Sequence, residues 1–291
     1  MLKVLSFNIL APRAADPDDH DPVNEPWLNI EHRRKKILSV LNADYDIIGL
    51  QEVTHDTVVH CRGASYSKAG EYGHLTSLLE DNYHCGYVDH DVSYCAEWQR
   101  YDPSSPYYYI SNGNALFLKR TTFSEVQFFN LPLGGGNHAI GAQVWYNGRR
   151  LYVVNLHLDS DSDDARSTEF TAALSALQTA DNVLILGDHN AGTDIDPLHS
   201  IRTYYGYADA FGSRAVPTYP LTRKLSKRRP VDHILYRGPA LRVQSTQTLG
   251  AKIWHHYPYQ EDDAVQHFRL NAVLSQFGSD HLPITASFTV I

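Results

Sequence analysis

Cysteine is scarce in this sequence, and its spacing excludes two kinds of structural support. Three cysteines occur among 291 residues, at Cys61, Cys85 and Cys95. Their number is odd and no two of them form a C-x-x-C pair, which argues against a disulfide framework and against a thiolate zinc site. The cysteine content therefore favours a reducing compartment, and we expect an intracellular protein of the cytoplasm or the nucleus.

Long hydrophobic runs are also missing. No apolar stretch of the sequence approaches the length that is needed to span a membrane. The amino-terminal segment "MLKVLSFNILAP" has an apolar run that Ser6 and Asn8 interrupt, and this run is too short for the core of a signal peptide. We therefore expect neither export nor a membrane partner.

The sequence has no low-complexity tract, no internal repeat, and no linker rich in glycine, proline or serine. Hydrophobic residues make up 43% of the chain, which is enough to fill an ordinary soluble core. These features predict a single domain over residues 1–291, and we expect it to be monomeric.

Positive charge is in deficit. The chain has 25 Lys and Arg residues against 33 Asp and Glu residues, a formal net charge of -8. A whole-molecule attraction to phosphate backbones is therefore not available, because such attraction needs a net positive surface. Any contact with nucleic acid must be made by a local patch.

Apolar stretches of strand length recur along the chain. They begin at Lys3, Asp46, Asn114, Ala142, Arg150, Asn182, Val231 and Pro283, and most are rich in Val, Ile, Leu or aromatic residues. Apolar residues also recur at helical spacing over residues 30–41 and 167–178. Some predicted strands are followed by helices and others follow one another directly. This order predicts an α/β (α+β) architecture of mixed sheets with helices packed outside.

Polar residues of catalytic type lie in or beside the predicted strands. They are Asn8, Glu52, His157, Asp188, Asn190, Asp232, Asp280 and His281. Any one of them alone is more often a cap, a turn former or a solvated loop residue. Together, these carboxylates, carboxamides and histidines are the inventory of a metal-assisted phosphoryl-transfer site. Hard oxygen ligands suit Mg²⁺, with Mn²⁺ as the alternative.

The motifs "FNIL", "LQE", "NLHL", "GDHN", "VDHILY" and "SDHLPI" follow one another in this order from end to end of the chain. The order resembles that of the endonuclease/exonuclease/phosphatase superfamily with its DNase I-like fold. This resemblance implies a four-layer sandwich, in which two packed mixed β-sheets are flanked by helices. The opening "VLSFNILAP" is similar to the poly(A) deadenylases and nocturnin, whereas "HLDSDSDDARSTEF" is similar to the tyrosyl-DNA phosphodiesterases.

The resemblance also implies a metal site. Glu52 would be the main metal-binding carboxylate, helped by Asn8, with Asp280 close to the same cation. Clustered acids repel one another unless a divalent ion neutralises them.

For the remaining site residues, the resemblance implies roles around the phosphate. Asp188 and Asn190 would orient the attacking water and hold the phosphate. His157 and His281 would donate hydrogen bonds to the non-bridging oxygens, and Asp232 would orient His281. Asp188 and His281 both remain candidates for the group that takes the proton of the water.

Two histidines depart from the family's pattern. His189 stands in "GDHN" where relatives more often carry Phe, Thr, Met or Leu, and it would either contact substrate or fill space beside the site. His233 replaces a usual aromatic residue in "VDHILY". We expect His233 to be a packed or surface residue rather than a ligand.

Two further segments bear on the substrate. The segment "SYCAEWQRYDPSSPYYYISNGN" is dense in aromatic residues, and Tyr109 and Asn112 in it are candidates for substrate contact by stacking and hydrogen bonding. The run "TRKLSKRRP" includes Arg228 and Arg229, which could grip a phosphodiester backbone. Aromatic residues that cover an apolar surface and a solvated basic loop are the alternatives.

We therefore predict a divalent-metal-dependent phosphodiesterase or nuclease that hydrolyses phosphodiester bonds of single-stranded or terminal nucleic acid, in the manner of a deadenylase or a tyrosyl-DNA phosphodiesterase. The alternative is a phosphatase or phosphodiesterase acting on a small or lipid phosphate, such as a nucleotide, an inositol phosphate or a sphingomyelin-like lipid. A catalytically dead binding module is disfavoured, because no expected acid or histidine is missing.

Overall fold

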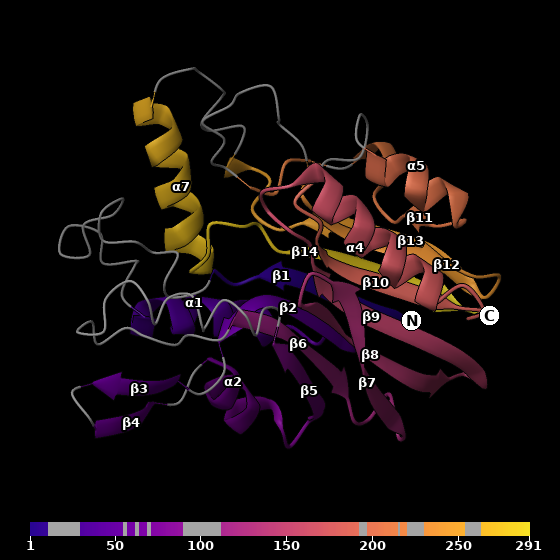
Figure 1. Cartoon of the computed structure of the whole chain (residues 1–291), viewed down its shortest axis with the longest axis horizontal. Helices are drawn as coiled ribbons and strands as arrows, with labels where there is room; N and C mark the ends of the chain where they lie inside the picture. Colours follow the sequence, from indigo (N-terminus) through magenta and orange to yellow (C-terminus); the bar gives the residue numbers. More distant parts are fainter. Residues whose placement is uncertain are drawn as a thin grey trace.

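Two six-stranded β-sheets that pack face to face form the centre of the computed structural model (Figure 1). The structure describes residues 1–10, 30–54, 57–61, 64–68, 71–89, 112–191, 197–214, 216–219, 230–253 and 263–291. The first sheet has the order β13 (Leu241–Thr248), β14 (Ile284–Val290), β1 (Leu2–Asn8), β2 (Ile47–Thr54), β6 (Asn112–Lys119) and β5 (Tyr83–Asp89). The second has the order β11 (Ala208–Asp209), β12 (Asp232–Arg237), β10 (Val183–Asp188), β9 (Arg149–His157), β8 (Asn137–Tyr146) and β7 (Val126–Gly134).

Both sheets are mixed, and their strand directions follow the same pattern. In the first sheet β1 and β2 are parallel, and in the second β9 and β10 are parallel, while the other neighbours are antiparallel. The carboxyl ends of parallel neighbours lie at the same edge of a sheet. Each sheet therefore brings the ends of two successive polar motifs together.

Three apolar clusters separate four layers. One fills the space between the sheets, with Val4 and Leu116 from the first sheet and Val153 and Leu184 from the second. A second cluster lies between the first sheet and the helices α1 (Ile30–Leu41), α2 (Glu71–Leu79) and α7 (Asp263–Phe277). A third lies between the second sheet and α4 (Asp163–Ala176) and α5 (Pro197–Tyr204). This arrangement confirms the predicted four-layer sandwich.

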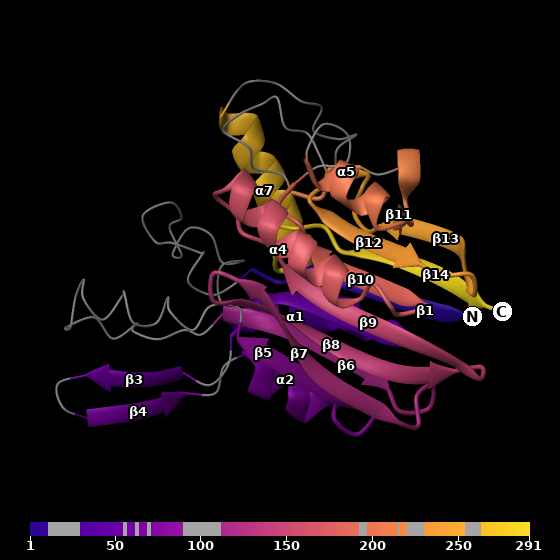
Figure 2. The same ribbon diagram turned by 45° about the vertical axis from the view of Figure 1, so that its right-hand side comes forward.

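Two short elements and several strands were not predicted from the sequence. The hairpin β3 (Thr57–Cys61) and β4 (Ala64–Lys68) stands apart from the two large sheets (Figure 2), and a short 3-10 helix, η2, covers Gly212–Arg214. β5, β7, β11 and β13 each form at or beside a sheet edge, where the apolar signal is weak. In the described part of the chain, no helix combines the length and the apolarity that a membrane crossing requires.

The ladder between β2 and β6 is interrupted just before the site. Leu50 pairs with Ala115, and the next pair is Val53 with Gly113, so two residues of β2 oppose one residue of β6. One of the two residues is Glu52, which has a positive φ of 57°. This β-bulge re-aims the Glu52 side chain out of the alternation of the strand.

A buried carboxamide from the other sheet fills the gap in the ladder. The side-chain amide of Asn155, on β9, donates to the Leu50 carbonyl at 2.8 Å and to the Ala115 carbonyl at 2.9 Å. Its oxygen accepts a hydrogen bond from the side-chain amide of Gln51. Two buried carbonyls beside the bulge thus each accept from this side chain, as buried polar groups need a partner. A Cβ at Gly49 would lie 2.8 Å from the Asn155 oxygen, so the position requires glycine.

Candidate active site

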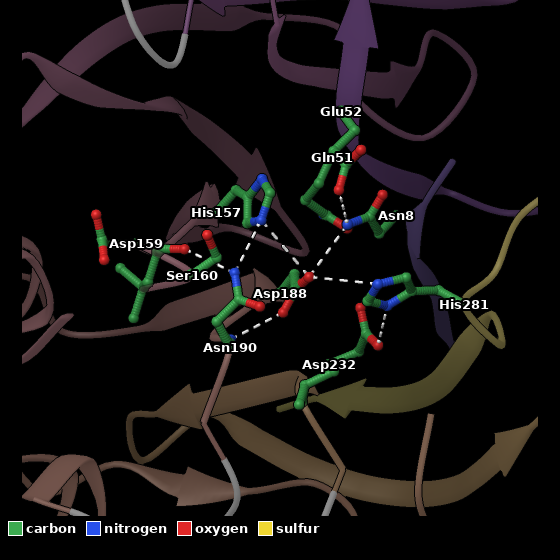
Figure 3. A network of polar contacts seen from close by, with 12 residues as sticks. Asn8, Gln51, Glu52, His157, Asp159, Ser160, Asp188, Asn190, Asp232 and His281 are labelled. Carbon is green, nitrogen blue, oxygen red and sulfur yellow. Dashed lines mark hydrogen bonds and ion pairs between the residues drawn. The ribbon is translucent and has the colours of Figure 1, made fainter. Parts of the chain in front are cut away.

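Side chains from both sheets converge at the edge where the two parallel pairs end (Figure 3). Asn8 is the last residue of β1, and Glu52 lies in the bulge of β2. His157 and Asp188 are the last residues of β9 and β10 and lie opposite each other in the ladder. Asp232 is the first residue of β12 and lies opposite Asp188 on its other side.

The Asp188 carboxylate occupies the centre of this cluster and is almost completely buried, with 1% of its surface exposed. Its Oδ2 lies 3.1 Å from Nδ2 of Asn8, 3.6 Å from Nε2 of His157 and 3.7 Å from Nε2 of His281. Its Oδ1 accepts a hydrogen bond of 2.8 Å from the backbone amide of Asn190. A buried carboxylate needs such donors, because desolvation penalises its charge.

Gly187 allows Asp188 to approach β9 closely. It has a φ of 149°, and a Cβ at this position would lie 1.9 Å from the Leu156 carbonyl oxygen. Only glycine fits where two backbones approach so closely. The first residue of the "GDHN" motif must therefore be glycine, because a side chain there would collide with the backbone of β9.

His281 and Asp232 form a buried pair. Nδ1 of His281 lies 2.9 Å from Oδ2 of Asp232, and the ring's Nε2 faces Asp188. Burial alone would lower the pKa of His281, but the carboxylates of Asp232 and Asp188 raise it well above its ordinary value. The two carboxylates therefore favour the charged ring, in which Nδ1 donates to Asp232 and Nε2 faces Asp188.

The turn after β10 places a carboxamide beside His157. Asn190 has a positive φ of 50°, which asparagine tolerates better than most residues. Its Nδ2 donates to the Leu158 carbonyl at 2.8 Å and lies 3.0 Å from Nε2 of His157. Asn190, His157 and Asp188 thus form one connected group.

Asn8, Glu52 and Asp280 lie on the side of the cluster that the first sheet provides. Nδ2 of Asn8 donates to Oε1 of Glu52 at 2.8 Å. Burial raises the pKa of Asp280 to about 6; the positive charge of His281 opposes this shift, and the negative charge of Glu52 adds to it. The two mutually repelling carboxylates offer oxygen donors that fit a divalent cation such as Mg²⁺. The Asn8 carboxamide lies beside them, and its own oxygen accepts from the Leu10 amide at 3.0 Å.

Asp188, Asp232 and His281 form a second set of possible metal ligands. One ligand atom each from Asp188, Asp232 and His281 lie within 4.8 Å of one another, and all three residues are buried. Because His281 donates from Nδ1 to Asp232, its ligand atom in this set would be Nε2, which faces Asp188, and the set would contain one nitrogen. The oxygen set of Asn8, Glu52 and Asp280 is therefore the better match for Mg²⁺, which prefers oxygen ligands.

Sequence reasoning missed two residues next to His281. The Tyr219 ring centroid lies 4.9 Å from that of His281. Burial raises the pKa of the Tyr219 hydroxyl, and the charges of Asp280, Glu52 and Asp188 raise it further, so the hydroxyl lies in the field of these carboxylates. Thr218 accepts hydrogen bonds from the backbone amides of Val231 and Asp232.

The short motif "PTYP" at residues 217–220 was the available signal for both missed residues. It holds them between two prolines shortly before the basic run.

Two side chains of α4 hold the start of the segment "HLDSDSDDARSTEF", residues 157–170, which is similar to the tyrosyl-DNA phosphodiesterases. Arg166 donates from NH1 to the Asp159 carbonyl at 2.6 Å, and Oε2 of Glu169 accepts from the Asp159 amide at 2.8 Å. Both side chains are buried. They fix the residues that follow His157 and set Ser160 beside His157 and Asn190 (Figure 3).

The two histidines that depart from the family's pattern contact each other. His189 and His233 are both buried, and their ring centroids lie 4.8 Å apart. The other neighbour of His189 is Phe170, at 5.2 Å between centroids. His189 thus fills space between α4 and β12.

The described part of the structure does not show where the side chains of the four predicted substrate-binding residues lie. Asn112 begins β6 opposite Thr54, and only its backbone is described. Tyr109, Arg228 and Arg229 lie outside the described residues, as do the other aromatic residues of that segment. Their contact with substrate stays a prediction.

Comparison with known proteins identifies the fold and the family. The profile of the Endonuclease/Exonuclease/phosphatase family matches residues 5–281. No curated protein matches the sequence.

Solved structures give consistent results at low sequence identity. The human Nocturnin catalytic domain with bound sulfate has 19% identity and a TM-score of 0.66, over 100% of this chain and 94% of that one. ANGEL2, a 2',3'-cyclic phosphatase, in complex with adenosine-2',3'-vanadate, has 16% identity and a TM-score of 0.65, over 99% of this chain and 95% of that one. TDP2 of D. rerio, complexed with a single-strand DNA product, has 15% identity and a TM-score of 0.56, over 99% of both chains. At these identities the likeness shows the DNase I-like fold alone, whereas the profile covers nearly the whole sequence, and the chain therefore belongs to the endonuclease/exonuclease/phosphatase family.

Proposed function

We propose that this chain is a divalent-metal-dependent phosphodiesterase, a single-domain monomer over residues 1–291 that hydrolyses phosphodiester bonds of single-stranded or terminal nucleic acid. The observation that carries the proposal is the Asp188 carboxylate, which is held among the carboxamide of Asn8, the backbone amide of Asn190 and the imidazoles of His157 and His281. The arrangement contains hydrogen-bond donors for a phosphate and an acceptor for a water proton. It contains no activated serine or cysteine nucleophile among the described residues, and this supports direct attack by water.

Asp188 is the group that orients the water and takes its proton. The carboxylates of Asp232 and Asp188, which face the two ring nitrogens of His281, raise its pKa and favour the fully protonated ring. A fully protonated imidazole cannot act as a base, so the choice that the sequence leaves open falls on Asp188.

The phosphate would be held by three donors. Nε2 of His281 and Nε2 of His157 face the Asp188 side chain, and Nδ2 of Asn190 lies beside Nε2 of His157 (Figure 3). Donors that are fixed before the reaction stabilise the charge that develops on the phosphoryl oxygens. The Asn190 donor is fixed by its bond to the Leu158 carbonyl.

Glu52, Asn8 and Asp280 would hold Mg²⁺, or Mn²⁺ in its place. When bound, the cation supplies charge neutralisation for the phosphate and the leaving oxygen. The chain itself contributes the bulge that turns Glu52 toward Asn8, and the Ser279 hydroxyl, which donates to the Asn8 carbonyl at 2.7 Å and so ties the Asp280 segment to β1.

The substrate class rests on the sequence and on the neighbours. The aromatic segment before Asn112 and the basic run with Arg228 and Arg229 provide the residue types that bind single strands. A single-strand DNA product is bound in the TDP2 neighbour. The alternative is hydrolysis of a small phosphate ester such as a nucleotide, and the adenosine-2',3'-vanadate bound in ANGEL2 favours testing it in parallel.

The proposal is tested by incubating the purified protein with Mg²⁺ and a panel of substrates. The panel contains an oligoadenylate with a free 3' end, a 5'-tyrosyl single-stranded DNA, the same DNA as a duplex, a 2',3'-cyclic nucleotide and a mononucleotide. We expect turnover of a single strand that is lost in excess chelator and in the Asp188→Asn variant, which keeps the shape of the side chain. Asp181→Asn is the matched control, because Asp181 is an exposed residue that precedes β10.

Three results would contradict the proposal. Turnover that is unchanged in chelator would exclude the metal, and hydrolysis by Asp188→Asn at the wild-type rate would exclude Asp188. Turnover of the mononucleotide alone would favour the alternative substrate class. Replacing Arg228 and Arg229 by glutamine should weaken oligonucleotide binding and flatten its salt dependence by about one unit of slope for each lost phosphate contact.

A further inference from the structure

A cluster of buried polar side chains lies behind the turn that carries Asn190. His233, on β12, is 3% exposed. Its Nδ1 lies 2.8 Å from Oδ2 of Asp209, on β11, and its Nε2 lies 3.1 Å from the carbonyl oxygen of Ala191. Arg202, on α5, lies 3.5 Å from the same Asp209 oxygen. His233 directly follows Asp232, and Ala191 directly follows Asn190.

Both partners of the His233 ring are acceptors, one a carboxylate and the other a carbonyl. The ring can satisfy both only by donating from both nitrogens. Burial disfavours the charged ring, but the hydrogen bond that the ring donates to Asp209 and the negative charge of Asp209 raise the pKa of His233 above its ordinary value. The bond to Ala191 is therefore charge-assisted, which makes it stronger than a bond between neutral groups.

The Ala191 carbonyl directly follows Asn190, the residue with a left-handed backbone. The backbone amide of Asn190 is fixed by Asp188 at 2.8 Å, and its side chain is fixed by the Leu158 carbonyl at 2.8 Å. The contact of His233 with Ala191 adds a third point, on the far side of the turn. These three hydrogen bonds, made by the Asn190 backbone amide, the Asn190 side chain and the Ala191 carbonyl, together fix the orientation of the Asn190 carboxamide.

The orientation of the His233 ring is itself fixed. His189 packs on it with ring centroids 4.8 Å apart, and Phe170 supports His189 from the other side. Asp209 is in turn held by the Phe211 amide at 2.8 Å. An apolar aromatic residue at position 233 could fill the same space, but it could not hold the Ala191 carbonyl.

We infer that His233 is a positioning residue, which holds the Ala191 carbonyl and so fixes the Asn190 carboxamide against His157. The inference rests on the proposed function insofar as Asn190 holds the phosphate. His189 and His233, the two residues that depart from the family's pattern, then act together: His189 packs on the His233 ring and orients it.

The first measurement does not need activity. His233→Phe removes both donors and keeps an aromatic ring. Hydrogen exchange of the His189 and Asn190 amides, which donate to the Val231 carbonyl and to Asp188, reports local opening of the turn. We expect these amides to exchange about tenfold faster or more in His233→Phe, since a hydrogen bond to a charged group is lost.

The matched control is His84→Phe. His84 also holds a backbone carbonyl, that of Phe123 at 3.0 Å, but it lies on β5 at the outer edge of the first sheet. It should leave exchange at His189 and Asn190 unchanged. If His233→Phe does not fold, His233→Leu removes the same donors with a smaller side chain and is judged by the same exchange rates.

The second measurement is a kinetic cycle with Asn190→Ala on the single-stranded substrate. His233→Phe alone should lower kcat about tenfold with KM changed less than about threefold, because the lost geometry matters most in the transition state. In the Asn190→Ala background the same change should lower kcat less than about twofold, because its target is gone.

Two outcomes overturn the inference. One is unchanged exchange at His189 and Asn190 in His233→Phe, and the other is a loss of kcat of equal size in both backgrounds. If the wild type turns over no substrate in the panel, the proposed function fails, whereas the exchange measurement still decides whether His233 holds the turn.

Discussion

Replacing Asn155 by leucine should destabilise the protein, because Asn155 donates hydrogen bonds to two buried carbonyls beside the bulge that carries Glu52. Leucine has a similar size and no polar atom. The change removes the amide that donates to the Leu50 and Ala115 carbonyls, and both carbonyls are in the interior between the sheets. No water can replace the lost partner in a packed core without a cavity.

The magnitude follows from the number of groups left without a partner. A buried acceptor that loses its hydrogen bond costs about 1 to 3 kcal/mol, so two carbonyls cost about 2 to 6 kcal/mol. The lower half of this range already removes a large share of a typical free energy of unfolding of about 5 to 15 kcal/mol. Gln51 keeps a second contact, the Ser6 hydroxyl at 3.4 Å, so its amide adds little to the loss.

Asn114→Leu is the matched control. Asn114 is equally buried, on the strand that faces the bulge, and its amide satisfies a single carbonyl, that of His138 at 3.0 Å. We expect about 1 to 3 kcal/mol for this change, roughly half the cost of Asn155→Leu.

Urea unfolding of the wild type and both variants, followed by circular dichroism, measures the differences. The midpoints should shift while the slopes m stay equal, because the same surface is exposed on unfolding. If Asn155→Leu costs no more than Asn114→Leu, or less than about 1 kcal/mol, the carboxamide does not support the bulge in the way described.

Three further predictions concern the charges of the site. Glu52→Gln should weaken Mg²⁺ binding about tenfold or more in calorimetric titration, and an unchanged titration would identify another carboxylate as the ligand. Asp232→Asn and His281→Ala should be strongly non-additive in kcat, because the acid acts through the histidine; a double loss equal to the product of the single losses would separate them. Burial opposes the lowered pKa of Asp209 and the raised pKa of its partner His233, but their mutual attraction prevails. Asp209 thus contributes stability above its ordinary value of 3.8 that is lost as the pH falls through the lower folded value, and His233 contributes stability below 6.5 that is lost as the pH rises through the higher folded value. The stability advantage of the wild type over His233→Phe should be largest between about pH 4 and 6.5 in urea titrations, and an advantage that does not vary with pH would contradict the pairing.

The sequence predicted those parts of the structure that depend on local pattern. Asn8, His157 and Asp188 could be recognised because each ends a continuous apolar run, and such runs form buried strands. Parallel neighbours then place their ends together, so the cluster follows once the fold is known. The four layers were predicted by the order of the motifs rather than by any single segment.

Other parts could not be predicted, because they depend on contacts between residues distant in the sequence. The bulge at Glu52 lies where Asn155, from the other sheet, donates to the Leu50 and Ala115 carbonyls, and no local signal in the sequence marks it. Tyr219 lies in a segment without periodicity, and only its packing on His281 brings it to the site. His233 looks like a packed residue in the sequence, and its role depends on Asp209 and Ala191.

The order in which the chain supplies the two sheets has a consequence for biosynthesis. Every strand of the second sheet lies within residues 126–237, whereas the first sheet combines residues 2–119 with residues 241–290. On a ribosome, the second sheet can therefore be complete while β1 still lacks β14, its neighbour in the finished sheet. Because His281 lies three residues before the start of β14, the histidine that faces Asp188 arrives together with that strand. A nascent chain would thus carry Asp188 and Asp232 before the histidine that faces them, and the cluster would be complete only when β14 has paired with β1.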